Sequence, residues 1–132
     1  MIVENAIRSH LLAQAGLTAL IADKLYYVTA PQTVVAPYVV FFKVSAVPVY
    51  SLSGESRLVD ARFQFSIFAG SYLETKQIAA QIQLALQDKC NAVIGGAGGV
   101  NVSVQFENEQ DLYVPDPGLF HCSVEYFVQY NE

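Results

Sequence analysis

Alternation of apolar and polar residues predicts two adjacent strands in the middle of the chain. For residues 38–50 the expected apolar face comprises Tyr38, Val40, Phe42, Val44 and Ala46, with Lys43 and Ser45 on the other face. Residues 59–69 alternate more regularly, and their expected buried face comprises Val59, Ala61, Phe63, Phe65 and Ile67. The intervening SLSGESR, with Gly54 at its tip, predicts a hairpin.

The C-terminal third contains two more segments with the same period. The first starts at Val100 and continues through Val102, Val104 and Phe106. The second is the last strand, whose expected buried face comprises Phe120, Cys122, Val124, Tyr126, Val128 and Tyr130. Between them, residues 107–120 are expected to form an exposed connection, and residues 91–100 a flexible, glycine-rich one.

Two stretches have the period of a helix. Residues 3–15 carry apolar side chains four residues apart, with Gly16 expected as the C-cap and Thr18 as the N-cap of a short helical turn over residues 17–24. Residues 28–37 are predicted to form a loop, because Pro31 and Pro37 interrupt regular secondary structure.

Residues 73–90 predict the main helix, because they contain no Gly or Pro. Its wide apolar stripe, expected to lie on the sheet, comprises Ile78, Ala79, Ile82, Ala85 and Leu86. Leu73, Ala80 and Leu84 form a narrower stripe on the opposite side of the helix. We expect this second stripe to contact a neighbouring subunit, since a two-layer domain alone would leave it in water.

The order of elements is helix, strands, helix, strands. This order favours an α+β fold, a mostly antiparallel sheet with two main helices on one face, in a single domain spanning residues 1–132.

Composition narrows the function. Of 132 residues, 53% are hydrophobic and only 14% charged, so the chain has more apolar surface than its own core needs, which favours oligomerisation. The net charge of −5 disfavours specific nucleic-acid binding, which relies on Lys and Arg. Neither a signal-peptide pattern nor an apolar run of membrane-span length is visible, and two cysteines make no disulfide framework. We therefore expect a protein made in a reducing cytosol, without membrane contact.

Two motifs suggest binding chemistry, and each has a simpler interpretation. GGAGGV at residues 95–100 has a phosphate-loop composition, but a phosphate loop needs a strand before it and a helix after it, whereas here a helix precedes and a strand follows. The acidic residues Glu107, Glu109, Asp111 and Asp116 lack the spacing and central Gly of a calcium loop. They are better explained as a solvated edge or an interface rim, with Glu107 and Glu109 on one face of a strand end.

The histidines and cysteines do not suggest catalysis. His121 and Cys122 are consecutive in a strand and should point to opposite faces, while His10 is expected on a helix surface. We therefore predict no catalytic residue, no cofactor and no metal site.

The whole chain resembles the tail-completion, or tail-terminator, proteins of long-tailed bacteriophages and prophages. The motifs that carry the resemblance, in order, are AGLTAL (15–20), PYVVF (37–41), ARFQF (61–65), SYLET (71–75), EQDLY (109–113) and DPGLFH (116–121). The resemblance rests on their order and spacing together.

The resemblance implies a small structural subunit without enzymatic activity. Such subunits form a homo-hexameric ring at the head-proximal end of the tail tube in the virion, after assembly in the host cytoplasm. Its partners would be other copies of itself, the tail tube protein and the head–tail connector, and DNA would pass through the ring without specific binding. We expect the interface to include Leu73, Ala80, Leu84, Glu107, Glu109, Asp111, Tyr113 and Asp116.

Two alternatives stay open at this point. The first is another head–tail joining protein or a minor tail protein of similar build. The second, from a different class, is a small ligand- or nucleotide-binding enzyme that uses the glycine loop and the acidic residues. The enzyme alternative requires saturable binding of a nucleotide or a divalent metal that is lost on mutation of Gly96 or Asp111.

Overall fold

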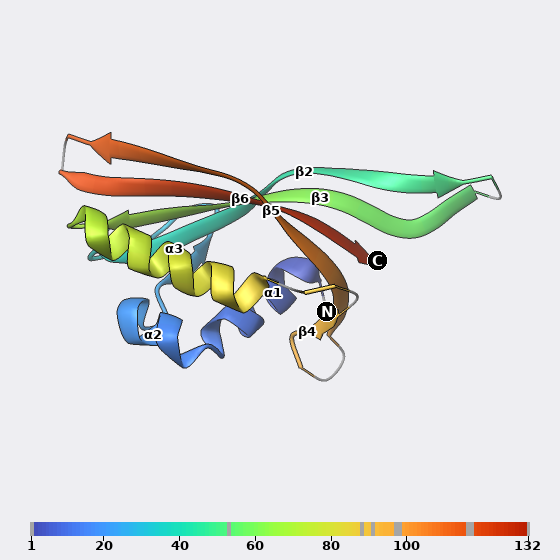
Figure 1. Ribbon diagram of the computed structural model, residues 1–132, viewed down its shortest axis with the longest axis horizontal. Helices are drawn as coiled ribbons and strands as arrows, with labels where there is room; N and C mark the ends of the chain where they lie inside the picture. The colour runs from blue at the N-terminus through green and yellow to red at the C-terminus, as the bar shows by residue number, and fades with distance from the viewer. Residues whose placement is uncertain are drawn as a thin grey trace.

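The computed structural model describes residues 2–52, 54–87, 89–90, 92–96, 99–115 and 118–131. They form one six-stranded sheet and three helices (Figure 1). The helices are α1 (Val3–Leu12), α2 (Ala15–Ile21) and α3 (Tyr72–Leu86). The strands are β1 (Leu25–Tyr27), β2 (Tyr38–Ser51), β3 (Gly54–Ala69), β4 (Ala92–Ile94), β5 (Val100–Val114) and β6 (Leu119–Asn131).

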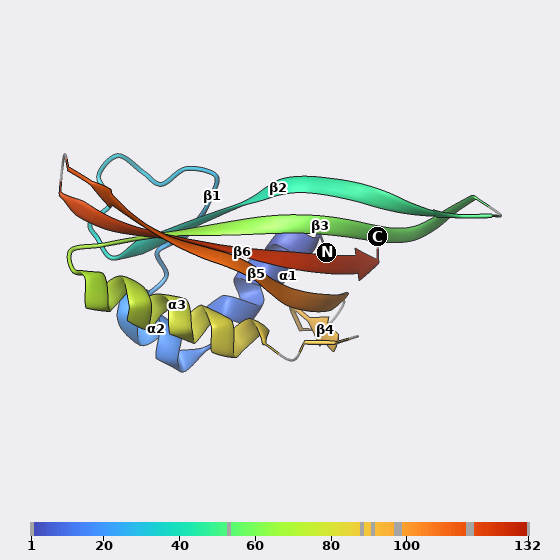
Figure 2. The same ribbon diagram turned by 45° about the horizontal axis from the view of Figure 1, so that its top comes forward.

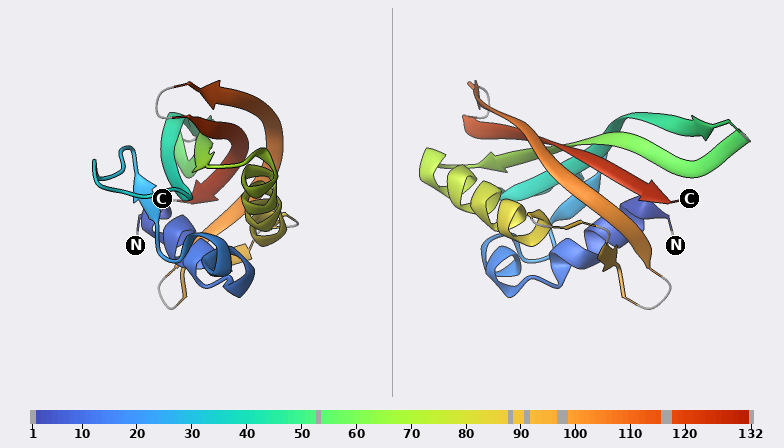
Figure 3. Two further views of the ribbon diagram at one scale, coloured as in Figure 1. Left: turned by 90° about the vertical axis from the view of Figure 1, so that its left-hand side faces the viewer. Right: turned by 45° about the vertical axis from the view of Figure 1, so that its right-hand side comes forward.

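The sheet has the strand order β1-β2-β3-β6-β5-β4 and is antiparallel except between β1 and β2. All three helices lie on one side of it, and the strands twist strongly along its length (Figures 2 and 3). The predicted α+β class with two main helices is therefore confirmed, and α2 overlaps the short helical turn expected over residues 17–24.

The core lies between the inner face of the sheet and the helices. The predicted inward residues of β3 and β6 are buried, and Phe65 packs between Phe41 and the edge of Tyr126 at ring-centroid distances of 5.4 and 5.7 Å. The wide stripe of α3 is buried as predicted; it comprises Ile78, Ala79, Ile82, Ala85 and Leu86. Regular periodicity thus identified the strands and the helix that form the centre of the core.

The expected caps near Gly16 are wrong. α1 ends at Leu12, and Gly16 lies inside α2, whose N-cap is Gln14. Thr18 is also helical, and its hydroxyl donates to the carbonyl of Gln14. A Cβ on Gly16 would come within 2.3 Å of the amide oxygen of Gln81, so the glycine permits close approach of α2 to α3.

The predicted apolar face of β2 is also wrong. Val39 and Phe41 are fully buried on the helix side, and Tyr38, Val40 and Phe42 face the other way. These three line an apolar groove of about 720 Å³ closed by the loop of residues 28–36, which explains their apolar character. A β-bulge between Lys43 and Ser45 then exchanges the two faces, which no single alternating pattern can describe.

The acidic stretch is a strand rather than a loop. β5 continues to Val114, so only residues 115–118 connect it to β6, and the expected connection over residues 107–120 is wrong. A second bulge, between Phe106 and Asn108, shifts the pairing by one residue. Polar side chains at regular spacing on both faces concealed this strand from a search for apolar alternation.

Two short edge strands, β1 and β4, fall in segments for which no strand was predicted. Each has three residues and covers only the first part of its neighbour, β2 or β5. No helix among the described residues is long and apolar enough to cross a membrane.

Candidate functional site

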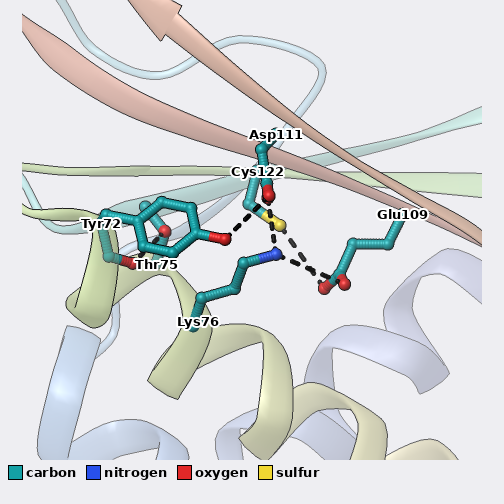
Figure 4. Close-up of polar contacts among 6 residues, drawn as sticks. All are labelled: Tyr72, Thr75, Lys76, Glu109, Asp111 and Cys122. Carbon is teal, nitrogen blue, oxygen red and sulfur yellow. Dashed lines mark hydrogen bonds and ion pairs between the residues drawn. The ribbon is translucent and has the colours of Figure 1, made fainter.

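The acidic residues of β5 meet a lysine of α3 above the inner face of the sheet. The ammonium of Lys76 lies 2.5 Å from Asp111 Oδ1 and 3.4 Å from Glu109 Oε2 (Figure 4). Tyr72 donates its hydroxyl to Asp111 Oδ2 at 2.9 Å, and the thiol of Cys122 on β6 donates to Glu109 Oε1 at 3.6 Å. We call these five side chains the Lys76 cluster.

Local sequence positions this cluster. Ser71 caps α3 by accepting a hydrogen bond from the Glu74 amide at 3.2 Å, which fixes where the helix starts. Tyr72 and Lys76 are four residues apart and share one side of the helix, facing β5. The bulge at Glu107 places Glu109 and Asp111 opposite Val124 and Cys122, on the inner face.

Charge pairing explains the titration of the cluster. The hydrogen bond from Lys76 is the main cause that holds the pKa of Asp111 below its ordinary value, and the same bond raises the pKa of Lys76. Burial, reinforced by the negative charge of Glu109, raises the pKa of the Cys122 thiol to about 12. At neutral pH the cluster therefore keeps Asp111 as a carboxylate, Lys76 as an ammonium and Cys122 as an un-ionised thiol.

This arrangement does not suit catalysis. A nucleophilic cysteine needs a lowered pKa, whereas that of Cys122 is raised and its side chain is buried. Both carboxylates are engaged by Lys76, and the described residues contain no group of His, Cys, Asp or Glu suited to a metal ion. The Lys76 cluster is best understood as a link between α3 and the outer part of β5.

Glu107 belongs to a different surface. Because of the bulge, it points away from the cluster and pairs with Arg62 of β3 at 2.9 Å. The expectation that Glu107 and Glu109 share one face is therefore wrong. Tyr113, near the end of β5, is 55% exposed and packs on Phe120 at a centroid distance of 5.0 Å.

The narrow stripe of α3 lies in solvent in the single chain, since Leu73 is 67% exposed, Leu84 59% exposed and Ala80 also exposed. The remaining predicted interface residue, Asp116, lies outside the described residues. The structure therefore brings Glu109 and Asp111 together and leaves Leu73, Ala80 and Leu84 on another surface.

Other candidate residues have structural roles. His121 stacks on Phe68 at 4.4 Å, on the face opposite Cys122 as predicted. His10, expected on a surface, is half-buried, and its Nε2 lies 2.8 Å from the carbonyl oxygen of Ala85, near the C-terminus of α3. A lone histidine in a helix carries no sequence signal for such a contact.

The glycine-rich segment connects two strands. β4, and not the expected helix, directly precedes it and β5 follows it, so the glycines lead into a strand instead of the helix N-terminus that a phosphate loop needs. A Cβ on Gly99 would lie 2.0 Å from the carbonyl oxygen of Ile94, which explains the glycine at this position by close backbone approach.

The β2–β3 hairpin presents a further surface, for which the sequence predicted no interface residue. The hairpin extends well beyond the helices (Figure 1), and its described exposed large apolar residues are Val44, Val47, Tyr50 and Leu52. Leu52, in the turn itself, is fully exposed. The available signal was an apolar run too long for the core to cover.

The fold and its surfaces define the class of protein. Its sheet is covered by helices on one side, apolar residues are exposed on α3 and at the hairpin, and the titratable cluster is paired internally. Exposed apolar surface of this kind is a feature of subunits that assemble with other proteins.

Comparison with known proteins identifies the family. The profile of the family described as tail completion protein gp17 matches residues 5–130, so the chain belongs to that family. It is therefore a structural component of bacteriophage tails.

Solved structures share the fold. A chain from the virion of a native gene transfer agent particle matches with a TM-score of 0.80 at 16% identity, covering 98% of this chain and 95% of that one. The gp17 protein of bacteriophage SPP1 matches with a TM-score of 0.59 at 17% identity, covering 98% and 88%. A search of curated protein sequences gave no match.

Proposed function

We propose that this protein forms a homo-hexameric ring on the head-proximal end of the phage tail tube. There it ends polymerisation of the tube and presents the surface to which the head connector binds. Membership of the tail completion family over residues 5–130 carries the proposal. The similar chain in the gene transfer agent virion supports a place within an assembled particle.

The exposed apolar surface supports self-association. Leu73 and Leu84 of α3 are more than half exposed, and the β2–β3 hairpin adds Val47, Tyr50 and Leu52. Two surfaces on different sides of a small subunit allow it to contact more than one neighbour. A ring subunit needs contacts with copies on both sides and with the tube or the connector.

Charge supports passage of DNA without adhesion. With a net charge of −5, the chain has few cationic side chains to neutralise phosphates. Arg62, on the sheet face away from the helices, is paired with Glu107. If that face lines the channel, DNA would meet a surface with little net attraction.

Deletion of the gene from its parent phage or prophage tests the proposal. Electron microscopy of induced lysates should show DNA-filled heads beside unjoined, often overlong tails, and a plasmid copy of the gene should restore joined particles. Normal joined virions from the deletion strain would exclude this function. Tails of normal length that lack heads would favour a different head–tail joining protein.

A further inference from the structure

Two edges of the sheet have no partner strand over most of their length among the described residues. β1 pairs with β2 only from Val39 to Phe41, and β4 pairs with β5 only from Val100 to Val102. Beyond these short strands, residues 44–48 of β2 and residues 105–113 of β5 are exposed. A free strand edge presents backbone donors and acceptors that can pair with another strand.

The two free segments lie at opposite ends of the molecule. In Figures 1 and 2 the β2–β3 hairpin projects from one end of the long axis, and the end of β5 and the start of β6 form the other. They also belong to opposite lateral edges of the sheet, since β2 lies on one side of the β3–β6 pair and β5 on the other. Successive antiparallel pairings make β5 run opposite to β2.

We propose that the free edge of β2 in one copy pairs with the free edge of β5 in the next copy, as an antiparallel ladder. This inference rests on the ring proposed above and names its subunit contact. A second copy in the same orientation presents β5 antiparallel to β2, so the sheet continues from copy to copy with the helices on one side. The contact uses two different edges, so it does not end at a dimer, and it repeats around a ring when the rotation between copies closes.

Charge favours this pairing over pairing of like edges. The free part of β5 carries Glu107, Glu109 and Asp111, so two β5 edges would bring acidic residues of both copies opposite each other. Residues 44–48 of β2 carry no charge and place no acid opposite those of β5. Two β2 edges would bring Pro48 of both copies, which lacks an N–H, into one ladder.

The pairing defines which side chains become neighbours. After the bulges, Ser45 and Val47 of β2 share the sheet face away from the helices, because they lie opposite Arg62 and Asp60. Asn108 and Gln110 of β5 lie on that same face, opposite Glu125 and Ser123. All four are exposed. Combining each of the two β2 residues with each of the two β5 residues gives four pairs, and these pairs test three registers of an antiparallel ladder, because Ser45 with Gln110 and Val47 with Asn108 belong to the same register.

Cysteine cross-linking in assembled particles tests the contact. In a Cys90→Ser background, four double variants combine Ser45→Cys or Val47→Cys with Asn108→Cys or Gln110→Cys, and each complements the deletion strain. Directly paired residues of neighbouring strands have Cα atoms about 4.5–5.5 Å apart, within the range of a disulfide. At least one double variant should give, on mild oxidation, a ladder of multimers that reducing agent dissolves.

The four variants with one introduced cysteine are the controls and should give no cross-linked product, because the remaining native cysteine, Cys122, is buried. A dimer from one single variant would overturn the inference, because it would show like edges in contact. Joined particles in which no double variant cross-links, by oxidation or with a short bismaleimide, would also overturn it. That result would leave the proposed ring intact, whereas joined particles from the deletion strain itself would refute the ring function.

Discussion

The outer stripe of α3 gives the sharpest test of the assembly role. Leu84 is replaced by Glu, a good helix former, at a position that is 59% exposed in the single chain. Complete burial of a leucine side chain contributes about 1.5–3 kcal/mol, so covering the exposed 59% contributes about 1–2 kcal/mol per contact. An unpaired carboxylate buried in the same contact adds a further penalty of several kcal/mol.

Leu84→Glu should therefore prevent assembly while the subunit stays folded. Its free energy of unfolding, measured by urea denaturation of the purified protein, should stay within about 0.5 kcal/mol of wild type. In the deletion strain it should give few joined particles by electron microscopy. Leu84→Ala should weaken each contact about 5- to 30-fold, from the same 1–2 kcal/mol.

Gln83→Glu is the matched control. Gln83 is exposed on the same helix but lies to one side of the stripe, so the same carboxylate there should leave joined particles at wild-type numbers. If Leu84→Glu supports normal numbers of joined particles, the stripe is not an interface. If both variants fail equally, added charge on α3 is the cause rather than the loss of Leu84.

Three further predictions concern the fold. Gly99→Ala should lower the melting temperature, because its Cβ would meet a backbone carbonyl at 2.0 Å, whereas Gly70→Ala, with no atom within 4 Å, should not. Iodoacetamide at pH 8, followed by mass spectrometry, should modify exposed Cys90 and spare buried Cys122, whose pKa is about 12; labelling of Cys122 in the folded protein would contradict its burial. Asp111→Asn should reduce the free energy of unfolding by about 0.2–1 kcal/mol at pH 7, as for other exposed ion pairs. Folding lowers the pKa of Asp111 from 3.8, so the difference in free energy of unfolding between wild type and variant should persist above that pH and vanish as the pH falls through the folded-state pKa. Urea unfolding measured from pH 7 to 2 checks this. A difference that does not change with pH would show that charge is not its origin.

The sequence predicted those elements in which one periodic pattern persists. β3 keeps its inward residues without interruption from Val59 to Ile67, and α3 keeps its wide stripe from Ile78 to Leu86. In both elements the residues that recur with the period of the strand or helix are the ones buried in the core, so the local pattern predicts the tertiary environment correctly.

The misassigned elements are those in which the pattern changes within a strand or is too short to detect. β2 is apolar on both faces because a loop covers its outer face near Tyr38, so alternation could not give its phase. β1 and β4, at three residues each, are fixed by their neighbours rather than by their own sequence. The interface roles of the acidic residues and of the α3 stripe stay predictions, because a single chain cannot show its partners.

The second bulge also determines how much of the acidic strand is available to a partner. Without the extra residue at Glu107, the alternation of Val102, Val104 and Phe106 would continue to Gln110, and Glu109 and Asp111 would point away from the helices. With it, both carboxylates reach Lys76 on the inner side, while Asn108 and Gln110 occupy the outer face. The acids then tie the exposed half of β5 to α3, which holds that edge in a fixed position. A strand edge held in this way is better prepared to pair with another copy than a free loop, because less conformational entropy is lost on binding.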